Sequence, residues 1–349
     1  MKFNFLSFLV AAFILCLILI PSGLLAADTK EVSAANEISI KLPEVKDFKT
    51  SEVCVIKTGK ETESVALGAV DTPAFPSNGP SSFAVDKKGN VYIIDAMNFK
   101  VLIVSKEGKV IKVIPYPAGE SSDTKEAFFM RDIAISPKDN SIYLLNFTNK
   151  NIFVISPTGE IKGDISIKDQ IKNPHKIFAA NDGTIYVKDE VTFDVVAYSA
   201  EGKVLGREKG YEISNFPNEE GYLYTLGERD QAGQDIVLLD PKGKGKPKVF
   251  GKMMKVITNT EPYDYQILGV DAKNNFYASI VEKIQEDVIQ TIIYKFGPDG
   301  KVISRLRVMP MPLIEDTMPT KHFVISPKGE IYAYSGTPHG EKFIILKVE

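Results

Sequence analysis

Short apolar runs alternate with polar turns along most of the chain, and one combination of the two occurs six times. In each copy Gly or Asn stands three residues before a Tyr, and an apolar residue directly precedes that Tyr. The copies are residues 89–92, 140–143, 183–186, 221–224, 274–277 and 329–332. Gly and Asn adopt positive φ most readily, so their position predicts a tight turn that leads into a strand. A short run, such as residues 83–86, precedes each turn, and each copy therefore predicts a β-hairpin.

A second turn follows the hairpin in the first five copies. It ends in Gly followed by Lys or Glu, with Ser, Pro or Asp before the Gly, which is typical of a type I turn. These turns are residues 105–108, 156–159, 199–202, 240–243 and 297–300. Apolar runs before and after them predict a third and a fourth strand. Four antiparallel strands in units that repeat about every 40–55 residues indicate the blades of a propeller.

The two ends of the chain predict how this propeller closes. The sixth unit has its Tyr at Tyr332 and a third strand at residues 343–348, but no fourth strand follows. Strand-like segments stand before the first unit, at residues 52–57 and 64–67, and we expect one of the two to complete the last blade. The sequence predicts an all-β fold, a six-bladed β-propeller of four-stranded antiparallel blades over residues 50–349. Residues 28–49 form a lead-in segment before it.

One stretch of the first unit resembles a known repeat. Residues 83–95 read Phe-Ala-Val-Asp-Lys-Lys-Gly-Asn-Val-Tyr-Ile-Ile-Asp and continue through Asn98 to a strand at 101–104. This resembles the NHL-repeat type of six-bladed propeller, within the wider TolB-like group, and the resemblance extends over residues 80–349. It implies the fold, but it does not indicate a function, because propellers host many chemistries. The fourth and fifth units depart from the pattern, with enlarged hairpins at 227–234 and 281–290.

The first residues indicate export. Lys2 is followed by an apolar run over residues 3–20, then by Pro21-Ser22-Gly23 and a short segment that ends in Ala26 and Ala27. This order is typical of a secretory signal peptide cleaved near Ala26 or Ala27, so residues 1–27 form a targeting segment. The run is also about long enough to span a bilayer, and a retained anchor is the alternative. Both interpretations place the body outside the cytoplasm, as a secreted, periplasmic or cell-surface protein that meets a membrane only through an uncleaved N-terminus.

Composition narrows the functional classes. The chain has 349 residues, of which 44% are hydrophobic and 25% charged, as in an ordinary globular protein. A net charge of −3 gives no support for nucleic-acid binding, which needs a clustered basic surface. Cys16 belongs to the targeting segment, so Cys54 is the lone cysteine of the body and has no partner for an intramolecular disulfide. Its apolar surroundings predict a small core residue.

Polar side chains are expected at the mouth of the central channel, where the innermost strands begin. Counting back ten or eleven residues from each Tyr reaches Ser81, Ser82, Asp132, His175, Lys176, Ser214, Gln266, Lys321 and His322. Among these we select a tentative ligand-binding set of Asp132, His175, Lys176, Gln266, Lys321 and His322. Two His and one Asp could hold a metal with water in a fourth position, which makes Asp132, His175 and His322 a tentative metal set. A polar, water-filled channel and a non-catalytic ligand pocket are the alternatives.

Two functional classes lead at this stage, and a third, a membrane-anchored sensor or assembly factor, depends on whether residues 3–20 are retained. The first is an exported scaffold that binds a protein, an extracellular polymer or a ligand through one face of loops, which include residues 116–124, 253–263 and 309–319. The second is a metal-dependent lyase or lactonase. The resemblance implies this alternative, because propeller lyases and lactonases place three His around zinc, or Glu, Asn and Asp around calcium, at such a ring. No Gly-x-Ser-x-Gly context indicates a nucleophilic serine, and whether the protein is an enzyme stays undecided.

Overall fold

The computed structural model describes residues 43–66, 79–117, 130–208, 216–218, 221–230, 233–240, 242, 248–252, 262–285, 288–311, 319–337 and 340–349. The chain divides into two compact units, Met1–Ile40 and Lys41–Glu349, and every described strand belongs to the second. The expected targeting segment, residues 1–27, and Ser214 lie outside the described residues. Among the residues described, no helix is long and apolar enough to cross a membrane.

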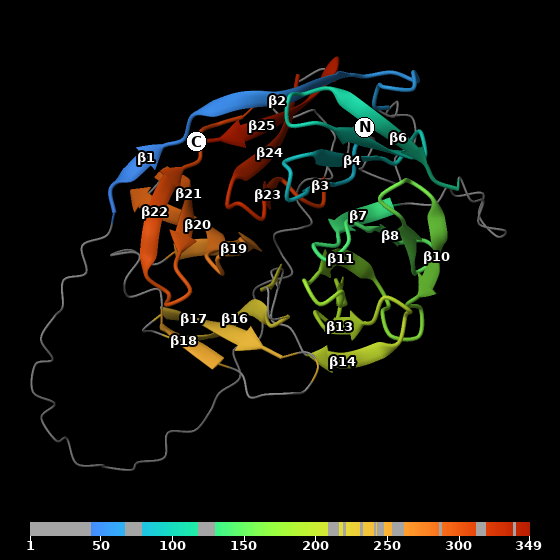
Figure 1. Cartoon of the computed structure of the whole chain (residues 1–349). Helices are drawn as coiled ribbons and strands as arrows, with labels where there is room; N and C mark the ends of the chain where they lie inside the picture. Colours follow the sequence, from blue (N-terminus) through green and yellow to red (C-terminus); the bar gives the residue numbers. More distant parts are fainter. Residues whose placement is uncertain are drawn as a thin grey trace, which may run out of the picture. The chain divides into compact units, whose positions relative to one another are not determined.

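The repeat units form four-stranded antiparallel sheets, as predicted (Figure 1). The first sheet contains β3 (Phe83–Val85), β4 (Val91–Asp95), β5 (Lys100–Val104) and β6 (Val110–Pro115). The second contains β7 (Met130–Ile135), β8 (Ile142–Asn146), β9 (Asn151–Ile155) and β10 (Ile161–Ser166). The third contains β11 (Pro174–Ala179), β12 (Ile185–Asp189), β13 (Val195–Tyr198) and β14 (Val204–Glu208). The next contains β15 (Phe216–Pro217), β16 (Leu223–Asp230), β17 (Gly233–Leu239) and β18 (Lys248–Lys252).

One sheet differs from the expected blade because it has five strands. It contains β19 (Pro262–Val270), β20 (Phe276–Gln285), β21 (Val288–Phe296) and β22 (Val302–Arg307), and β1 (Val45–Asp47) adds to it. β1 runs parallel to β22, with Val45 opposite Arg305 and Asp47 opposite Arg307. Part of the expected lead-in segment, residues 28–49, therefore lies in this sheet.

An N-terminal strand completes the last sheet, as predicted. This sheet contains β23 (Phe323–Ile325), β24 (Ile331–Gly336), β25 (Lys342–Val348) and β2 (Thr50–Lys57), with β2 antiparallel to β25. The other strand-like segment, residues 64–67, contributes only an isolated bridge between Val65 and Thr58. Cys54 on β2 is buried, as expected, and burial raises the pKa of its thiol to about 12, so the thiol is neutral at ordinary pH.

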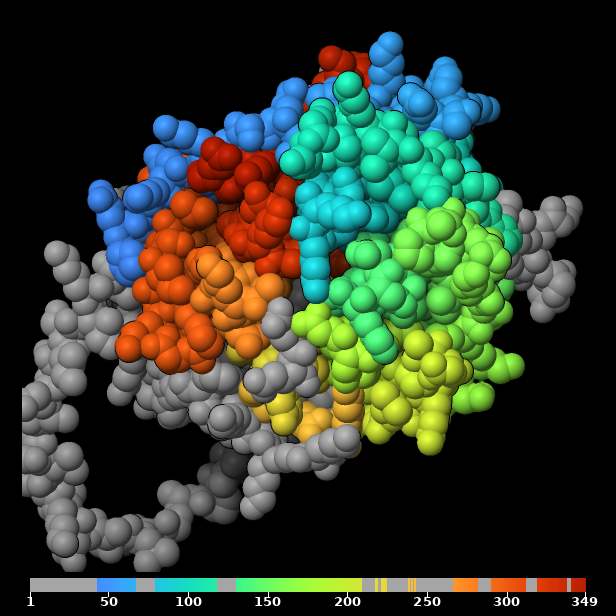
Figure 2. Space-filling model, viewed as in Figure 1, coloured from blue at the N-terminus to red at the C-terminus, as the bar shows by residue number. Residues whose placement is uncertain are grey.

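The innermost strands surround a central channel. β3 contacts β7, and contacts continue from β7 to β11, β15, β19 and β23, which returns to β3. In the space-filling view, segments that follow one another in the sequence lie side by side around this face (Figure 2). Apolar side chains pack between adjacent sheets; one cluster joins Ile94 of β4 to Leu144 of β8, and another joins Leu145 of β8 to Val187 of β12. Burial between the sheets holds the innermost strands in place around the channel.

The repeated Tyr and Gly also join neighbouring sheets. The hydroxyl of Tyr186, on β12, donates to the carbonyl oxygen of Gly221 in the next sheet at 2.6 Å. Tyr277 on β20 does the same toward Gly329 at 3.1 Å, and its hydroxyl lies 3.0 Å from a carboxylate oxygen of Asp271. Gly221 and Gly329 have φ of 83° and 81°, in the region that favours glycine. The motif therefore makes the turn and also provides a contact between sheets.

Candidate functional site

Asp132 on β7 is the centre of the polar cluster at the start of the innermost strands. Its side chain is fully buried, and four donors surround its carboxylate. Oδ1 accepts from the Ser82 hydroxyl at 2.6 Å and from the Ile133 backbone N–H at 2.9 Å, and it lies 2.8 Å from Nζ of Lys321. Oδ2 accepts from the Ile177 N–H at 2.9 Å. Because Ser82 precedes β3, Ile177 lies on β11 and Lys321 precedes β23, one carboxylate connects four sheets.

Two lysines lie beside this carboxylate. Lys321 also donates to the carbonyl oxygen of Ile133 at 2.8 Å, so Asp132 and β7 together fix its ammonium group. Lys176 on β11 is only 3% exposed, and it has no hydrogen bond or ion pair with any residue the structure describes. Burial lowers the pKa of Lys176 to about 8; Asp132 opposes this shift and Lys321 adds to it. Lys176 therefore feels the charges of both neighbours without pairing with either.

The two predicted histidines have different surroundings. Nδ1 of His175 lies 3.2 Å from the Arg131 guanidinium and 3.6 Å from Glu190. Burial, together with the charges of Lys176 and Arg131, lowers the pKa of His175 to about 4, so the ring is neutral at pH 7 and its contact with Glu190 is not an ion pair. Burial also lowers the pKa of His322, and the charge of Lys176 contributes to that shift. Both rings are therefore neutral neighbours of the lysines.

The structure brings together only part of the predicted set. Asp132, Lys176 and Lys321 form one electrostatic cluster with His175 and His322 beside it. Gln266 is half-buried on β19, where it lies opposite Ser279 of β20 in the strand register. Within the described residues no group of three or more His, Cys, Asp or Glu side chains could hold a metal ion. The tentative metal set of Asp132, His175 and His322 is therefore not assembled, because Asp132 is surrounded by four other donors and Nδ1 of His175 faces a guanidinium.

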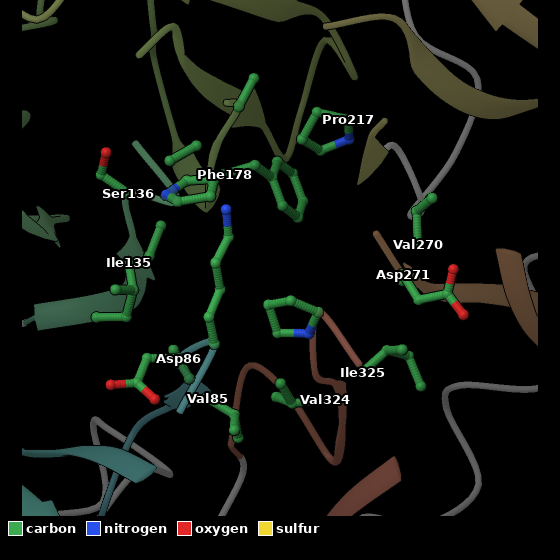
Figure 3. A pocket seen from close by; sticks show the side chains of 18 of the residues that line it. Val85, Asp86, Ile135, Ser136, Phe178, Pro217, Val270, Asp271, Val324 and Ile325 are labelled. Carbon is green, nitrogen blue, oxygen red and sulfur yellow. The ribbon is translucent and has the colours of Figure 1, made fainter. Parts of the chain in front are cut away.

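A cavity of about 190 Å³ occupies the channel at the other end of the innermost strands (Figure 3). Its walls are largely apolar, and Figure 3 shows Phe178, Val324 and Ile325 around it. Its rim contains Asp86, Ser136 and Asp271, in turns that follow innermost strands, and Pro217 at the end of β15. Lys321 also lines this cavity, although it precedes β23, so its ammonium group lies at the inner end of the space. Sequence reasoning missed the cavity because it searched only where the strands begin.

The carboxylates at the rim are occupied by their own turns. Asp86 accepts from the backbone N–H groups of Lys88 and Asn90 at 2.8 and 2.9 Å. Asp271 accepts in the same way from Lys273 and Asn275 at 2.9 and 3.0 Å. These hydrogen bonds are those of Asx turns, so both aspartates have a structural role. Among the described residues, Asp86, Lys87, Asp271 and Lys321 are the charged residues that line the cavity, and Lys321 is the one at its inner end.

Comparison with known proteins supports the fold. No protein-family model matches the chain, and no curated protein sequence matches it. A member of the DUF4221 family from Bacteroides vulgatus is 14% identical, with a TM-score of 0.50, over 88% of this chain and 99% of that one. A protein of Bacteroides fragilis inferred to be exported is 8% identical, with a TM-score of 0.50, over 86% and 95%. Virginiamycin B lyase from Staphylococcus aureus is 14% identical, with a TM-score of 0.46, over 86% and 99%.

At these identities the likeness shows a β-propeller and nothing finer. The narrower NHL-repeat assignment stays a prediction from residues 83–95. Function has to be argued from the channel and its charges, because the propeller fold serves many activities.

Proposed function

We propose that the protein is an exported propeller that works by binding, and that its ligand occupies the central channel. The observation that carries this proposal is the cavity of about 190 Å³, with apolar walls and a fixed ammonium group at its inner end. Concave, mostly apolar sites with a few placed polar groups are the usual form of small-molecule sites. The N-terminal signal supports export, as does the description of the Bacteroides fragilis neighbour as an exported protein.

The binding scaffold is favoured over the metal-dependent lyase or lactonase. That alternative needs Asp132, His175 and His322 as ligands of zinc or calcium, and the contacts of Asp132 and His175 engage them elsewhere. A protein or an extracellular polymer on the loop face remains part of the proposal as a second type of partner. Its support is the length of the connections between the repeat units in the sequence, since loops on a rigid scaffold often carry binding residues. Most of residues 116–124, 253–263 and 309–319 lie outside the described residues.

The test is whether closing the channel abolishes binding. Ala179 lines the cavity, so Ala179→Trp would fill it, and Ala179→Leu is a smaller change if the first variant does not fold. Val191→Trp is the matched control, because Val191 is 60% exposed and does not line the cavity. A small-molecule library is screened by thermal shift against the wild-type protein and these variants. We expect compounds that stabilise the wild type and Val191→Trp but not Ala179→Trp; equal stabilisation of all three proteins would contradict a channel site.

A further inference from the structure

The charged side chains that line the cavity balance one another. Two of them have an opposite charge close by, since Lys321 lies 2.8 Å from Asp132 and Asp271 lies 3.6 Å from Lys295. The other two, Asp86 and Lys87, are consecutive residues at the rim. The lining of the cavity therefore has no net charge that would favour an ionic ligand.

Two further buried lysines do not line the cavity. Lys176 on β11 and Lys188 on β12 are 3% and 0% exposed, and neither belongs to the lining. Nζ of Lys188 lies 5.8 Å from the centre of the Phe193 ring, in the connection between β12 and β13. Neither lysine therefore contacts a molecule in the cavity. Because the charge of Lys176 can still act through the wall, the experiment below includes an anion.

The polar groups at the inner end are engaged within the protein. The ammonium group of Lys321 is held by Asp132 and by the carbonyl oxygen of Ile133. Beside it, the Ser81 hydroxyl donates to the Met130 carbonyl oxygen at 2.6 Å, and the Thr320 hydroxyl donates to the Arg131 carbonyl oxygen at 2.8 Å. A charged group that entered the cavity would lose its own hydration without meeting an uncompensated opposite charge in the lining, which is costly.

The walls and the volume suit a small apolar body. Ile177, Phe178, Leu268, Val324 and Ile325 contribute to the walls, and the Phe178 ring offers an aromatic face (Figure 3). An apolar molecule would cover these side chains and displace water from them. An engineered apolar cavity of about 150 Å³ takes up benzene. A cavity of about 190 Å³ therefore admits one ring with a short substituent.

We propose that the channel binds a small uncharged molecule with an apolar body about the size of one ring. This inference rests on the proposed function, since it names the class of ligand for the same cavity. The balanced lining selects against anions and cations alike, and the apolar walls select against strongly polar molecules such as sugars.

Three matched probes test this inference in ligand-detected NMR titrations of the purified protein at pH 7. The probes 3-phenylpropan-1-ol, 3-phenylpropanoate and 3-phenylpropylammonium share one apolar body, and they are neutral, anionic and cationic. We expect the alcohol to bind at least about tenfold more tightly than either ion, because each ion gives up hydration in the cavity without a new partner. A smaller preference over either ion, or no binding of the alcohol, would overturn the inference.

Two variants distinguish the channel from other surfaces. Ala179→Trp fills the cavity and should abolish binding of the alcohol, with Ala179→Leu as the smaller change, while Val191→Trp should leave the binding unchanged. If an ion binds as tightly as the alcohol and Ala179→Trp abolishes both, the channel site stands and the preference for an uncharged ligand fails. If the alcohol binds equally to all of these proteins, the proposed function fails as well.

Discussion

Asp132 is a structural carboxylate whose neighbours determine what the site can do. Four donors from four different sheets converge on it, so its main effect is to hold the innermost strands together. The charge of Asp132 also acts on Lys176 and opposes the lowering of its pKa. The stability of the channel and the charge that a ligand would meet therefore depend on one side chain.

Asp132→Asn should lower the free energy of unfolding by about 3 kcal/mol, because it keeps the size of the side chain but leaves a buried ammonium group without its anion. Urea denaturation measures this loss. Asp299→Asn is the control, since Asp299 is 55% exposed and pairs with the still more exposed Lys301. A loss below about 1 kcal/mol for Asp132→Asn would contradict a central role for this carboxylate.

Lys176 should make stability depend on pH. Its pKa is about 8 in the folded protein and 10.5 ordinarily, so between these values the unfolded chain binds more protons. The free energy of unfolding contributed by Lys176 should therefore rise with pH through this window, by about 3 kcal/mol in total. The measurement is the difference between wild type and Lys176→Met from pH 7 to 11, which cancels the titration of other groups. A difference that does not change with pH would show that Lys176 titrates normally.

At the scale of the strands, the hairpins were predictable and their partners in other sheets were not. The Gly or Asn before each Tyr identified the turns, because positive φ is a local property of the chain. β1 could not be predicted: Val45–Asp47 is a short, mixed segment whose pairing is determined by the free edge of β22. Likewise, Lys176 and His175 are neighbours in the sequence and both stand near the start of an innermost strand. Their different environments depend on the packing of the folded chain, which buries Lys176 and places His175 beside Arg131.

The contact between Tyr277 and Gly329 predicts an unequal effect of two alanine substitutions. A Cβ at Gly329 would lie 2.5 Å from the Tyr277 hydroxyl oxygen, whereas one at Gly89 would have no neighbour closer than 3.5 Å. Both glycines have similar positive φ, 81° and 91°, so the backbone strain is shared. Gly329→Ala should therefore destabilise the protein more than Gly89→Ala, by about 1 kcal/mol or more, in thermal or urea unfolding. Equal losses of stability in the two variants would mean that the contact with Tyr277 adds no cost to the shared backbone strain.

At the scale of the molecule, the sequence predicted the propeller and its closure by an N-terminal strand, while the position of the cavity required the structure. Closure followed from a missing last strand, which is visible in the chain, and the pairing of β2 with β25 confirms it. The cavity depends on where the innermost strands leave space between their side chains. No local sequence pattern specifies how far apart the innermost strands lie across the channel. The sequence therefore indicates Lys321, near the start of an innermost strand, but not the cavity that it lines.

Export predicts a defined mature N-terminus. The signal at residues 1–27 should be removed near Ala26 or Ala27, so the intact mass of protein recovered outside the cytoplasm should match a chain that begins there. A membrane fraction that contains the full-length chain would instead support the retained anchor.

The central claim is that the channel cavity holds the ligand, and locating a bound compound tests it most directly. Crystals of the body are soaked in a compound that stabilises the wild-type protein but not Ala179→Trp, and the electron density locates it. We predict that the compound lies inside the channel, against the walls formed by Phe178 and Val324. A compound found only outside the channel would contradict the account.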